Sequence, residues 1–191
     1  LTSMGNITML SSMNSWLKIM RRQRSVSMEG NNMRVGIDNI DGGYTAIIDI
    51  KLLDENAKIP TRGSSEAAGY DLYAHIGMEE LAIQPHTTVK VGTGVAVSIP
   101  SGYFGAICAR SGLATKKGLR PANCLGVVDA DYIGEIMVAL HNDTDEYQTI
   151  ENGERIAQLV VIPFLPVEFN VVSELAETER GSGGFGSTGS K

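Results

Sequence analysis

The sequence is poor in the residues that cross-link small secreted folds or bind structural metals. Its only two cysteines, Cys108 and Cys124, are sixteen residues apart and form no C-x-x-C pair. The three histidines are scattered and match no metal-ligand spacing. We therefore expect no disulfide framework and no zinc site, and the cysteines are typical of reduced core thiols in a cytosol-like compartment.

Long apolar runs are missing as well, and positive charge is scarce. Although 42% of the 191 residues are hydrophobic, no run approaches the length that crosses a bilayer. The net charge is −6 at pH 7, whereas broad nucleic-acid binding needs many cations along one surface. The length fits one ordinary domain. We expect neither a membrane nor a nucleic-acid partner, while a small anionic ligand needs only a few cations.

Residues 1–33 differ in composition from the rest of the chain. They hold six of the eight methionines and four cations against Glu29 alone, a net charge of +3 that leaves −9 for the remainder. Apolar residues recur at helical spacing from Met13 to Met20, which is typical of a transit peptide or an interfacial helix. We predict that residues 1–43 are a disordered or weakly helical extension, either a leader or sequence foreign to the natural chain. We expect a cytoplasmic protein, or organellar import if the leader is native.

From residue 44 onward, short apolar or β-branched runs alternate with turn-forming residues. The runs that predict strands are residues 44–53, 91–99, 103–109, 135–140 and 155–164. Residues 111–118 are predicted to form one helical turn at most. This pattern predicts an all-β sandwich or jelly roll that occupies residues 44–179 as one domain.

The chain ends in RGSGGFGSTGSK, residues 180–191, which places a cation and an aromatic ring among glycines. The glycines match a dinucleotide fingerprint and most of a P-loop, but only five residues follow Gly186, so the loop has no helix to open. A plain spacer needs neither Arg180 nor Phe185. Glycine-serine tails are in general best explained as disordered, so residues 180–191 are either a disordered tail or a mobile strap that closes over a ligand.

Three internal stretches carry unusual chemistry. AAGYDLYA places Asp71 within an apolar strand pattern, and taken alone this residue is best explained as an edge or turn aspartate. ARSGLA, residues 109–114, follows a strand with a guanidinium, a hydroxyl and a glycine, which suit phosphate oxygens but are common at strand ends. NCLGVVDADYIGEI predicts a hairpin that turns within residues 129–134. Asp129 is then either a carboxylate aimed at a water molecule or an ordinary turn former.

Taken together and in order, five stretches resemble the motifs of the homotrimeric-type deoxyuridine triphosphate nucleotidohydrolases (dUTPases). They are AAGYDLYA, ARSGLA, GVVDADYIGEI, GERIAQLVVIP and RGSGGFGSTG, and the resemblance runs from Ala46 to Gly189. It implies a jelly-roll-like (β-clip) fold with little helix and a homotrimer whose sites are shared between subunits. It further implies that residues 180–191 are a mobile glycine-rich arm that closes an active site. It also implies hydrolysis of dUTP to dUMP and pyrophosphate, which limits uracil incorporation into DNA and supplies dUMP for dTMP synthesis.

The resemblance implies a role for each matching residue. Asp129 would activate the water that attacks the α-phosphorus, with Arg180 as the second catalytic residue. Asp71 would contact, through water, a Mg²⁺ ion that the triphosphate mainly binds. The implied substrate-binding residues are Arg110, Ser111, Gly112, Gln158, Arg180 and Gly186 at the phosphates; Asn123, Val127, Val128, Asp129, Met137 and Phe185 at the uracil; and Tyr132 at the deoxyribose.

Two other functions compete with dUTP hydrolysis. The first is a dCTP deaminase of the same fold group, which the Phe-bearing tail and the intact DADY segment argue against. The second is a dUTPase-like protein that mainly binds another protein. The chain has no sizeable insertion between its fourth and fifth motifs to serve as a partner surface, which argues against this function.

Overall fold

The computed structural model of the chain describes residues 37–40 and 43–184, with side chains from Ile47 onward. Most of the extension predicted for residues 1–43 lies outside these residues, as do Phe185 and Gly186, but Ile37–Ile40 form a strand where a disordered or weakly helical segment was predicted. In chain order the elements are β1 (Ile37–Ile40), β2 (Gly43–Ala46), β3 (Ile50–Leu52), β4 (Thr61–Arg62), β5 (Tyr70–Tyr73), β6 (Glu80–Ile83), β7 (Thr88–Gly92), β8 (Val95–Val97), β9 (Tyr103–Cys108), α2 (Ser111–Lys117), β10 (Leu119–Pro121), β11 (Gly126–Val128), β12 (Met137–Asn142), β13 (Gln148–Glu151) and β14 (Arg155–Pro163). The predicted all-β class is confirmed.

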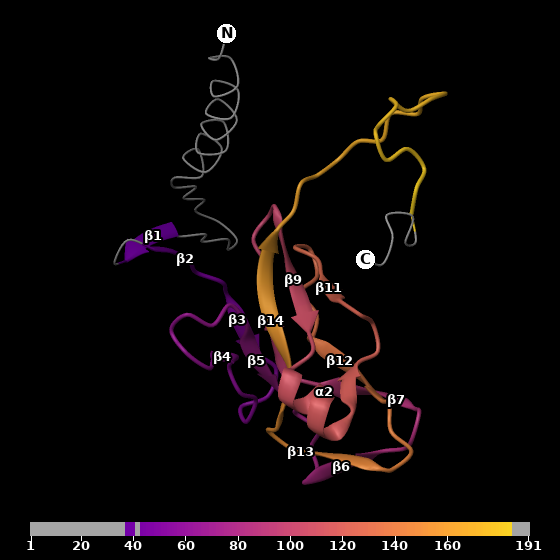
Figure 1. Cartoon of the computed structure of the whole chain (residues 1–191). Coiled ribbons are helices and arrows are strands. Elements are labelled where there is room, and N and C mark those ends of the chain that lie inside the picture. The colour runs from indigo at the N-terminus through magenta and orange to yellow at the C-terminus, as the bar shows by residue number, and fades with distance from the viewer. Residues whose placement is uncertain (1–36, 41–42, 185–191) are drawn as a thin grey trace.

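The strands form one large sheet, one smaller sheet and three two-stranded pairs. The large sheet has the order β11-β9-β14-β5-β4 and the smaller one the order β10-β12-β7, while β1-β2, β3-β8 and β6-β13 pair by themselves. All of these pairings are antiparallel. In Figure 1, β14 and β9 run side by side through the middle of the molecule, with α2 below them. The large sheet therefore brings together segments from both halves of the chain.

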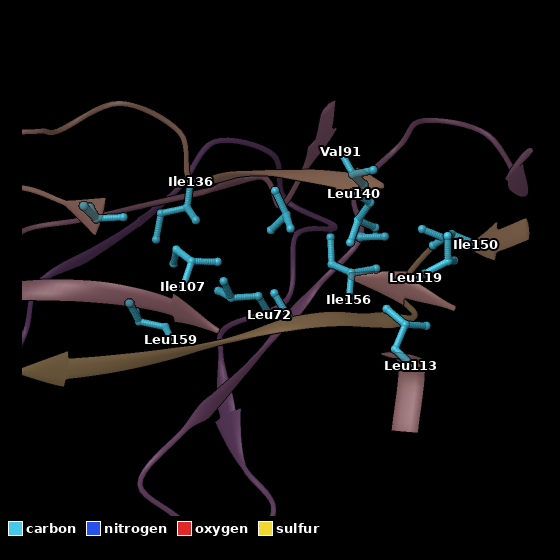
Figure 2. Packing of buried hydrophobic residues seen from close by; sticks show 14 of the residues in the cluster. Leu72, Val91, Ile107, Leu113, Leu119, Ile136, Leu140, Ile150, Ile156 and Leu159 are labelled. Carbon is cyan, nitrogen blue, oxygen red and sulfur yellow. The ribbon is translucent and has the colours of Figure 1, made fainter. Parts of the chain in front are cut away.

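A single apolar core joins the two larger sheets. Strand β12 shows how the sequence builds it, because Val138 and Leu140 are buried while the alternate residues Met137, Ala139 and His141 are more exposed. From the large sheet, Leu72, Ile107 and Leu159 enter the same cluster. Figure 2 shows these side chains gathered between the strands. This common core fixes the ends of β9, β11 and β12 relative to each other.

Two of the predicted strands are interrupted in the structure. The run 44–53 divides into β2 and β3, and the run 91–99 divides into β7 and β8. The second break lies at Thr93 and Gly94, where Gly94 adopts a φ of +68° that ends the extended conformation. The apolar pattern continues across this bend because the residues on both sides of it remain buried.

The prediction of at most one helical turn after β9 is wrong. Helix α2 spans seven residues and ends at Gly118, whose φ of +62° is a left-handed cap. Leu113 anchors it in the core, and the Lys117 ammonium donates hydrogen bonds to both carboxylate oxygens of Glu154 at 2.8 and 3.0 Å. Tertiary contacts therefore support a helix too short to be stable by itself.

The predicted hairpin over residues 123–136 is also wrong. Its first arm, β11, pairs with β9, whereas its second arm continues into β12, which pairs with β10 and β7. The two arms thus belong to different sheets, and residues 129–135 form a loop between them. The local hairpin loses to pairings with other strands, in which Val128 of one arm and Val138 of the other join the core.

After β14 the chain leaves the two sheets. Residues 164–184 contain no strand or helix, and Figure 1 shows this segment running away from the body. Its apolar side chains are exposed: they include Leu165, Phe169, Val171 and Leu175. Within the described residues, no helix has the length and apolar character needed to cross a membrane.

Candidate active site

A pocket of about 360 Å³ lies beside β11, the 129–135 loop and the beginning of β12. Of the residues predicted to bind substrate, those that line it are Asn123, Val127, Val128, Asp129, Tyr132 and Met137. Lys90 and Glu135 line the pocket as well, and the sequence reasoning missed both. The pocket therefore unites every residue that was predicted from the GVVDADYIGEI stretch.

Strand β11 forms a wall of this pocket and leaves one edge open. Among the described strands it pairs with β9 alone, so the peptide groups that point away from β9 can bind a ligand. Gly126 lets β11 pack closely against the neighbouring side chains of Ile107 and Asn123. A Cβ there would lie 2.8 Å from Ile107 Cβ and 3.2 Å from Asn123 Nδ2. An edge of N–H and C=O groups beside the Asn123 amide can read the hydrogen-bonding edge of a planar ring.

Asp129 lies at the rim of the pocket, directly after β11. Its backbone carbonyl accepts a hydrogen bond from the Tyr132 N–H at 3.1 Å, which closes a turn. The side chain is exposed, and within the described residues its carboxylate has no hydrogen-bond or ion-pair partner. Such a carboxylate is available to accept a proton from a water molecule.

Tyr132 is held by its own loop. Its hydroxyl donates a hydrogen bond to the Glu135 carbonyl at 2.8 Å. The ring crosses Gly134, where a Cβ would lie 2.8 Å from the ring carbon Cζ and 2.7 Å from the hydroxyl oxygen. Glycine at position 134 therefore allows the ring to lie against the backbone with its position defined.

A second cluster surrounds Asp71, whose side chain is only 12% exposed. Arg110 Nε donates to Asp71 Oδ1 at 2.7 Å, and Arg155 Nη1 donates to Asp71 Oδ2 at 3.2 Å. Arg110 Nη1 also donates to the Arg155 carbonyl at 3.3 Å. Asp71 lies within β5, between β14 and β4, so its interpretation as an edge or turn residue is wrong. Each guanidinium keeps further N–H donors for another anion.

The other predicted phosphate ligands surround the same cluster. Ser111 and Gly112 begin α2, both exposed, and their N–H groups have no partner from the preceding turn. Gln158 Nε2 donates to the Ala109 carbonyl at 2.9 Å. Gly69 lies against this side chain, and a Cβ there would meet Gln158 Oε1, so a larger residue would displace the amide from this position.

Arg155 was missed by the sequence reasoning, although a signal for it existed. A carboxylate buried in a strand needs cationic or hydrogen-bonding partners. The chain has sixteen lysines and arginines, and nothing local indicates which of them pairs with Asp71. The pairing depends on β14 and β5 lying side by side, which places Arg155 opposite Tyr73 in the register.

The predicted site residues fall into separate groups within one chain. The pocket lining contains no residue of the Asp71–Arg110 cluster and neither Ser111 nor Gln158. Arg180 lies on the segment that leaves the body, where its Nε donates to the Gly183 carbonyl at 2.8 Å. Phe185 and Gly186 lie outside the described residues. The described part of one chain therefore presents the pieces of the site at different places.

The described side chains contain no group of three His, Cys, Asp or Glu residues that could hold a divalent metal ion. Both Asp71 oxygens already accept hydrogen bonds from guanidinium groups. Each oxygen retains lone-pair capacity for a water molecule. The cluster thus does not fit a direct metal ligand, and it fits a water-mediated contact to a cation that a ligand carries, as Mg²⁺ usually is beside phosphates.

The family profile named dUTPase matches residues 55–189. The deoxyuridine 5'-triphosphate nucleotidohydrolase of Hydrogenobaculum sp. is 46% identical over 142 residues, which cover 74% of this chain and 97% of that protein. The enzyme of the same name from Debaryomyces hansenii is 46% identical over 140 residues and covers 72% of this chain and 84% of its own length.

Solved structures agree with this family. A variant dUTPase of Staphylococcus bacteriophage 80alpha with dUpNHpp has a TM-score of 0.69 and 34% identity, and the match covers 76% of this chain and 99% of that one. A variant dUTPase from phage phi11 of S. aureus, with a coordinated structural Mg(II) ion, has a TM-score of 0.60 and 29% identity, covering 69% and 99%. The predicted jelly-roll-like fold is thereby confirmed.

The Asp71 cluster predicts a large difference between two Asp→Asn replacements. Asp71→Asn removes the charge that compensates two guanidiniums and should lower the free energy of unfolding by about 2 to 4 kcal/mol. Asp143 accepts two hydrogen bonds from Arg120 but is 42% exposed. Asp143→Asn should therefore cost less than about 1 kcal/mol. Urea unfolding at one protein concentration measures both, and equal losses would contradict the role assigned to burial.

Proposed function

This chain belongs to the dUTPase family, and on that premise we propose that it hydrolyses dUTP to dUMP and pyrophosphate with a water molecule activated by Asp129. The observation that carries the proposal is the pocket beside β11, which combines an open strand edge, the Asn123 amide and the unpartnered Asp129 carboxylate. The reaction limits uracil incorporation into DNA and supplies dUMP for dTMP synthesis.

The uracil binds along β11. The peptide groups of Val127 and Val128 and the Asn123 amide meet its hydrogen-bonding edge, and cytosine is rejected because it leaves these groups unpaired. Strand β11 lies close beside the uracil ring and leaves no room for the methyl group of thymine. Met137 packs near the base. Tyr132 lies against the deoxyribose and leaves no room for a 2′-hydroxyl. The fixed position of its ring supports this role.

The triphosphate binds at the Asp71–Arg110 cluster. Arg110, Ser111, Gly112 and Gln158 supply N–H and hydroxyl donors to its oxygens. Arg110 is suited to this because Asp71 and the Arg155 carbonyl already hold its guanidinium in one orientation, and the other donors remain available. A preoriented donor group loses little conformational freedom when the substrate binds.

Asp129 acts as the general base. It accepts a proton from a water molecule while the water oxygen forms a bond to the α-phosphorus. The bond between this phosphorus and the α,β-bridging oxygen breaks, and pyrophosphate leaves with the electron pair. A base in this role contributes roughly a hundred- to ten-thousandfold to the rate.

Asp71 would hold, through water, a Mg²⁺ ion carried by the triphosphate. When bound, the ion neutralises phosphate charge and holds the phosphate chain in an orientation for in-line displacement. The two lone-pair positions that Asp71 keeps beside its arginine partners support a water-mediated contact. The Mg(II) ion of the phi11 relative is a property of that protein and agrees with a divalent cation here.

The C-terminal arm completes the site. We infer that Phe185 stacks on the uracil, and that Arg180 and the backbone near Gly186 contact the phosphates. Arg180 is exposed on the segment that leaves the body, so it is free to reach a site beyond its own sheets. A glycine-rich arm closes without a helix and excludes bulk water from the reaction.

A cyclic homotrimer brings the separate groups together. The pocket and the phosphate cluster lie apart in one chain, and the segment after β14 exposes Leu165, Phe169 and Val171. A run of exposed apolar side chains of this size calls for a partner that covers it. In a closed ring each chain donates its arm to a neighbour and receives one in return, so every chain is covered in the same way.

The first test is a substrate panel. The protein should release pyrophosphate from dUTP strongly in preference to dTTP, dCTP and UTP, and EDTA should lower the rate because the Mg²⁺ bound to the triphosphate is lost. Comparable turnover of dTTP or UTP would contradict the specificity assigned to the pocket. Ammonia release from dCTP would identify a deaminase instead.

The second test replaces the general base. Asp129→Asn should lower kcat at least about a hundredfold and leave dUTP affinity within a few-fold, because the amide cannot accept the proton. Asp131→Asn is the matched control, since Asp131 is an exposed aspartate two residues further along the same loop, and it should retain full kcat. If single-turnover hydrolysis survives in the Asp129 variant, Asp129 is only a turn residue.

The third test concerns the donated arm. One variant carries Asp129→Asn with an intact tail, and the other keeps Asp129 but ends after Glu179. Each should be nearly inactive alone. After refolding at equal amounts, each site draws its aspartate and its arm from different chains, so activity should return to about a quarter of wild type under cyclic donation.

The outcome separates two arrangements of the arm. An arm that closes over its own chain restores nothing, because no single chain carries both groups. Persistent inactivity in verified mixed trimers would therefore refute donation between subunits. Native mass spectrometry of the mixture, in which the truncated chain is lighter, verifies that mixed trimers are present.

A further inference from the structure

The loop that carries Tyr132 is attached to a distant bend of the chain. Three hydrogen bonds make the attachment: Thr93 Oγ1 donates to the Ile136 carbonyl at 2.6 Å, the Ile136 N–H donates to the Val95 carbonyl at 2.9 Å, and the Gly94 N–H donates to Glu135 Oε1 at 2.8 Å. They join residues more than forty positions apart. The bend between β7 and β8 is thus the support on which this loop rests.

The bend is shaped to receive the Glu135 side chain. A Cβ at Gly92 would lie 2.6 Å from Glu135 Oε1, so a larger residue there would displace the carboxylate. Gly94 has a φ of +68°, which directs its N–H to the same oxygen, and a Cβ there would lie 2.7 Å from Ala57 Cβ. Both glycines are required for this contact, which identifies the bend as a defined receptor for Glu135.

Thr93 holds the other side of the same segment. Thr93 is only 1% exposed, and its hydroxyl donates a hydrogen bond to the carbonyl of Ile136, a residue that is also buried. Removing the hydroxyl leaves that carbonyl without this partner inside the protein, which drives the backbone to shift. Thr93 and Glu135 therefore fix the backbone at residues 135 and 136 from two directions.

The position of Tyr132 depends on this segment. Its hydroxyl is bonded to the carbonyl of Glu135, the residue that the bend holds. At its other end, Tyr132 is linked to Asp129 through the turn hydrogen bond. A displacement of residues 135 and 136 would thus move the outer end of the ring more than the Asp129 end.

We propose that Thr93 and Glu135 are positioning residues for sugar discrimination: they hold the Tyr132 ring where it excludes a ribose 2′-hydroxyl. The inference rests on the proposed function, in which Tyr132 faces the deoxyribose. Discrimination against one hydroxyl depends on sub-ångström placement of the excluding group, and a displacement of about 1 Å can change a rate about a hundredfold. The Tyr132 hydroxyl is hydrogen-bonded to the Glu135 carbonyl. Loss of the contacts made by Thr93 and Glu135 should therefore reduce sugar selectivity more than it slows the chemical step.

The experiment measures kcat/KM for dUTP and for UTP in the full chain with Mg²⁺. Thr93→Val keeps the shape of the side chain and removes the hydroxyl, whereas Thr93→Ser keeps the hydroxyl. Glu135→Ala removes the acceptor, whereas Glu135→Gln keeps an oxygen in its place. Thr88→Val is the matched control, because Thr88 lies on β7 and its hydroxyl bonds to His141 Nδ1 at 2.9 Å, away from the loop.

Thr93→Val and Glu135→Ala should each lower the dUTP-to-UTP ratio of kcat/KM by about tenfold or more. The Ser, Gln and Thr88→Val variants should keep the ratio within about twofold of wild type. Glu135 is only half-buried, so its Ala variant tests the proposal even if the Thr93 variant fails to fold.

An unchanged ratio in folded Glu135→Ala protein overturns the proposal. So does an equal fall of dUTP and UTP turnover together with a lower Tm, since that pattern shows only a structural role. If the wild-type protein fails to prefer dUTP over UTP, the proposed function is refuted instead. The kcat/KM values of the wild-type protein therefore distinguish failure of the proposed function from failure of this inference.

Discussion

The carboxylate of Asp71 is the constraint on which the arrangement of β5, α2 and β14 depends. It lies within a strand and is almost completely removed from water, so its charge must be compensated by partners. Arg110, which precedes α2, and Arg155, which begins β14, both meet it. A single buried charge thereby joins β5 to the beginnings of α2 and β14. The same contacts orient the guanidinium of Arg110, the group that we propose binds the triphosphate.

Glycines have a corresponding role in and around the pocket beside β11. Gly126 allows β11 and Asn123 to approach, Gly134 accommodates the ring of Tyr132, and Gly92 accommodates the side chain of Glu135. In each case a Cβ would lie closer than 3.0 Å to a neighbouring atom. Close approach of backbone and side chains therefore defines the pocket, and polar groups are held in place without a metal cage in the described residues. The pocket beside β11 and the Asp71–Arg110 cluster share no residue within one chain, which is why we propose a symmetric ring.

Local patterns predicted much of the fold and failed at identifiable places. The strands of residues 103–109 and 155–164 appear as β9 and β14 within a residue of their expected ends. The hairpin over residues 123–136 failed because its two arms find better partners in different sheets. The helix after β9 was underestimated because Leu113 and Lys117 are held by the core and by Glu154. Neither competition between pairings nor tertiary support is visible in a short window of sequence.

The sequence by itself determined the all-β class and the residue types of the candidate site, because side-chain alternation and motif spacing are local properties. It placed a carboxylate at position 129 and a cation with a hydroxyl at positions 110 and 111. The tertiary structure alone decided which groups meet. Asp71 lies 39 and 84 positions from its two arginine partners, and Thr93 lies 43 positions from the carbonyl that it binds. Such contacts follow from strand order and register, which emerge only when all the strands compete for one core.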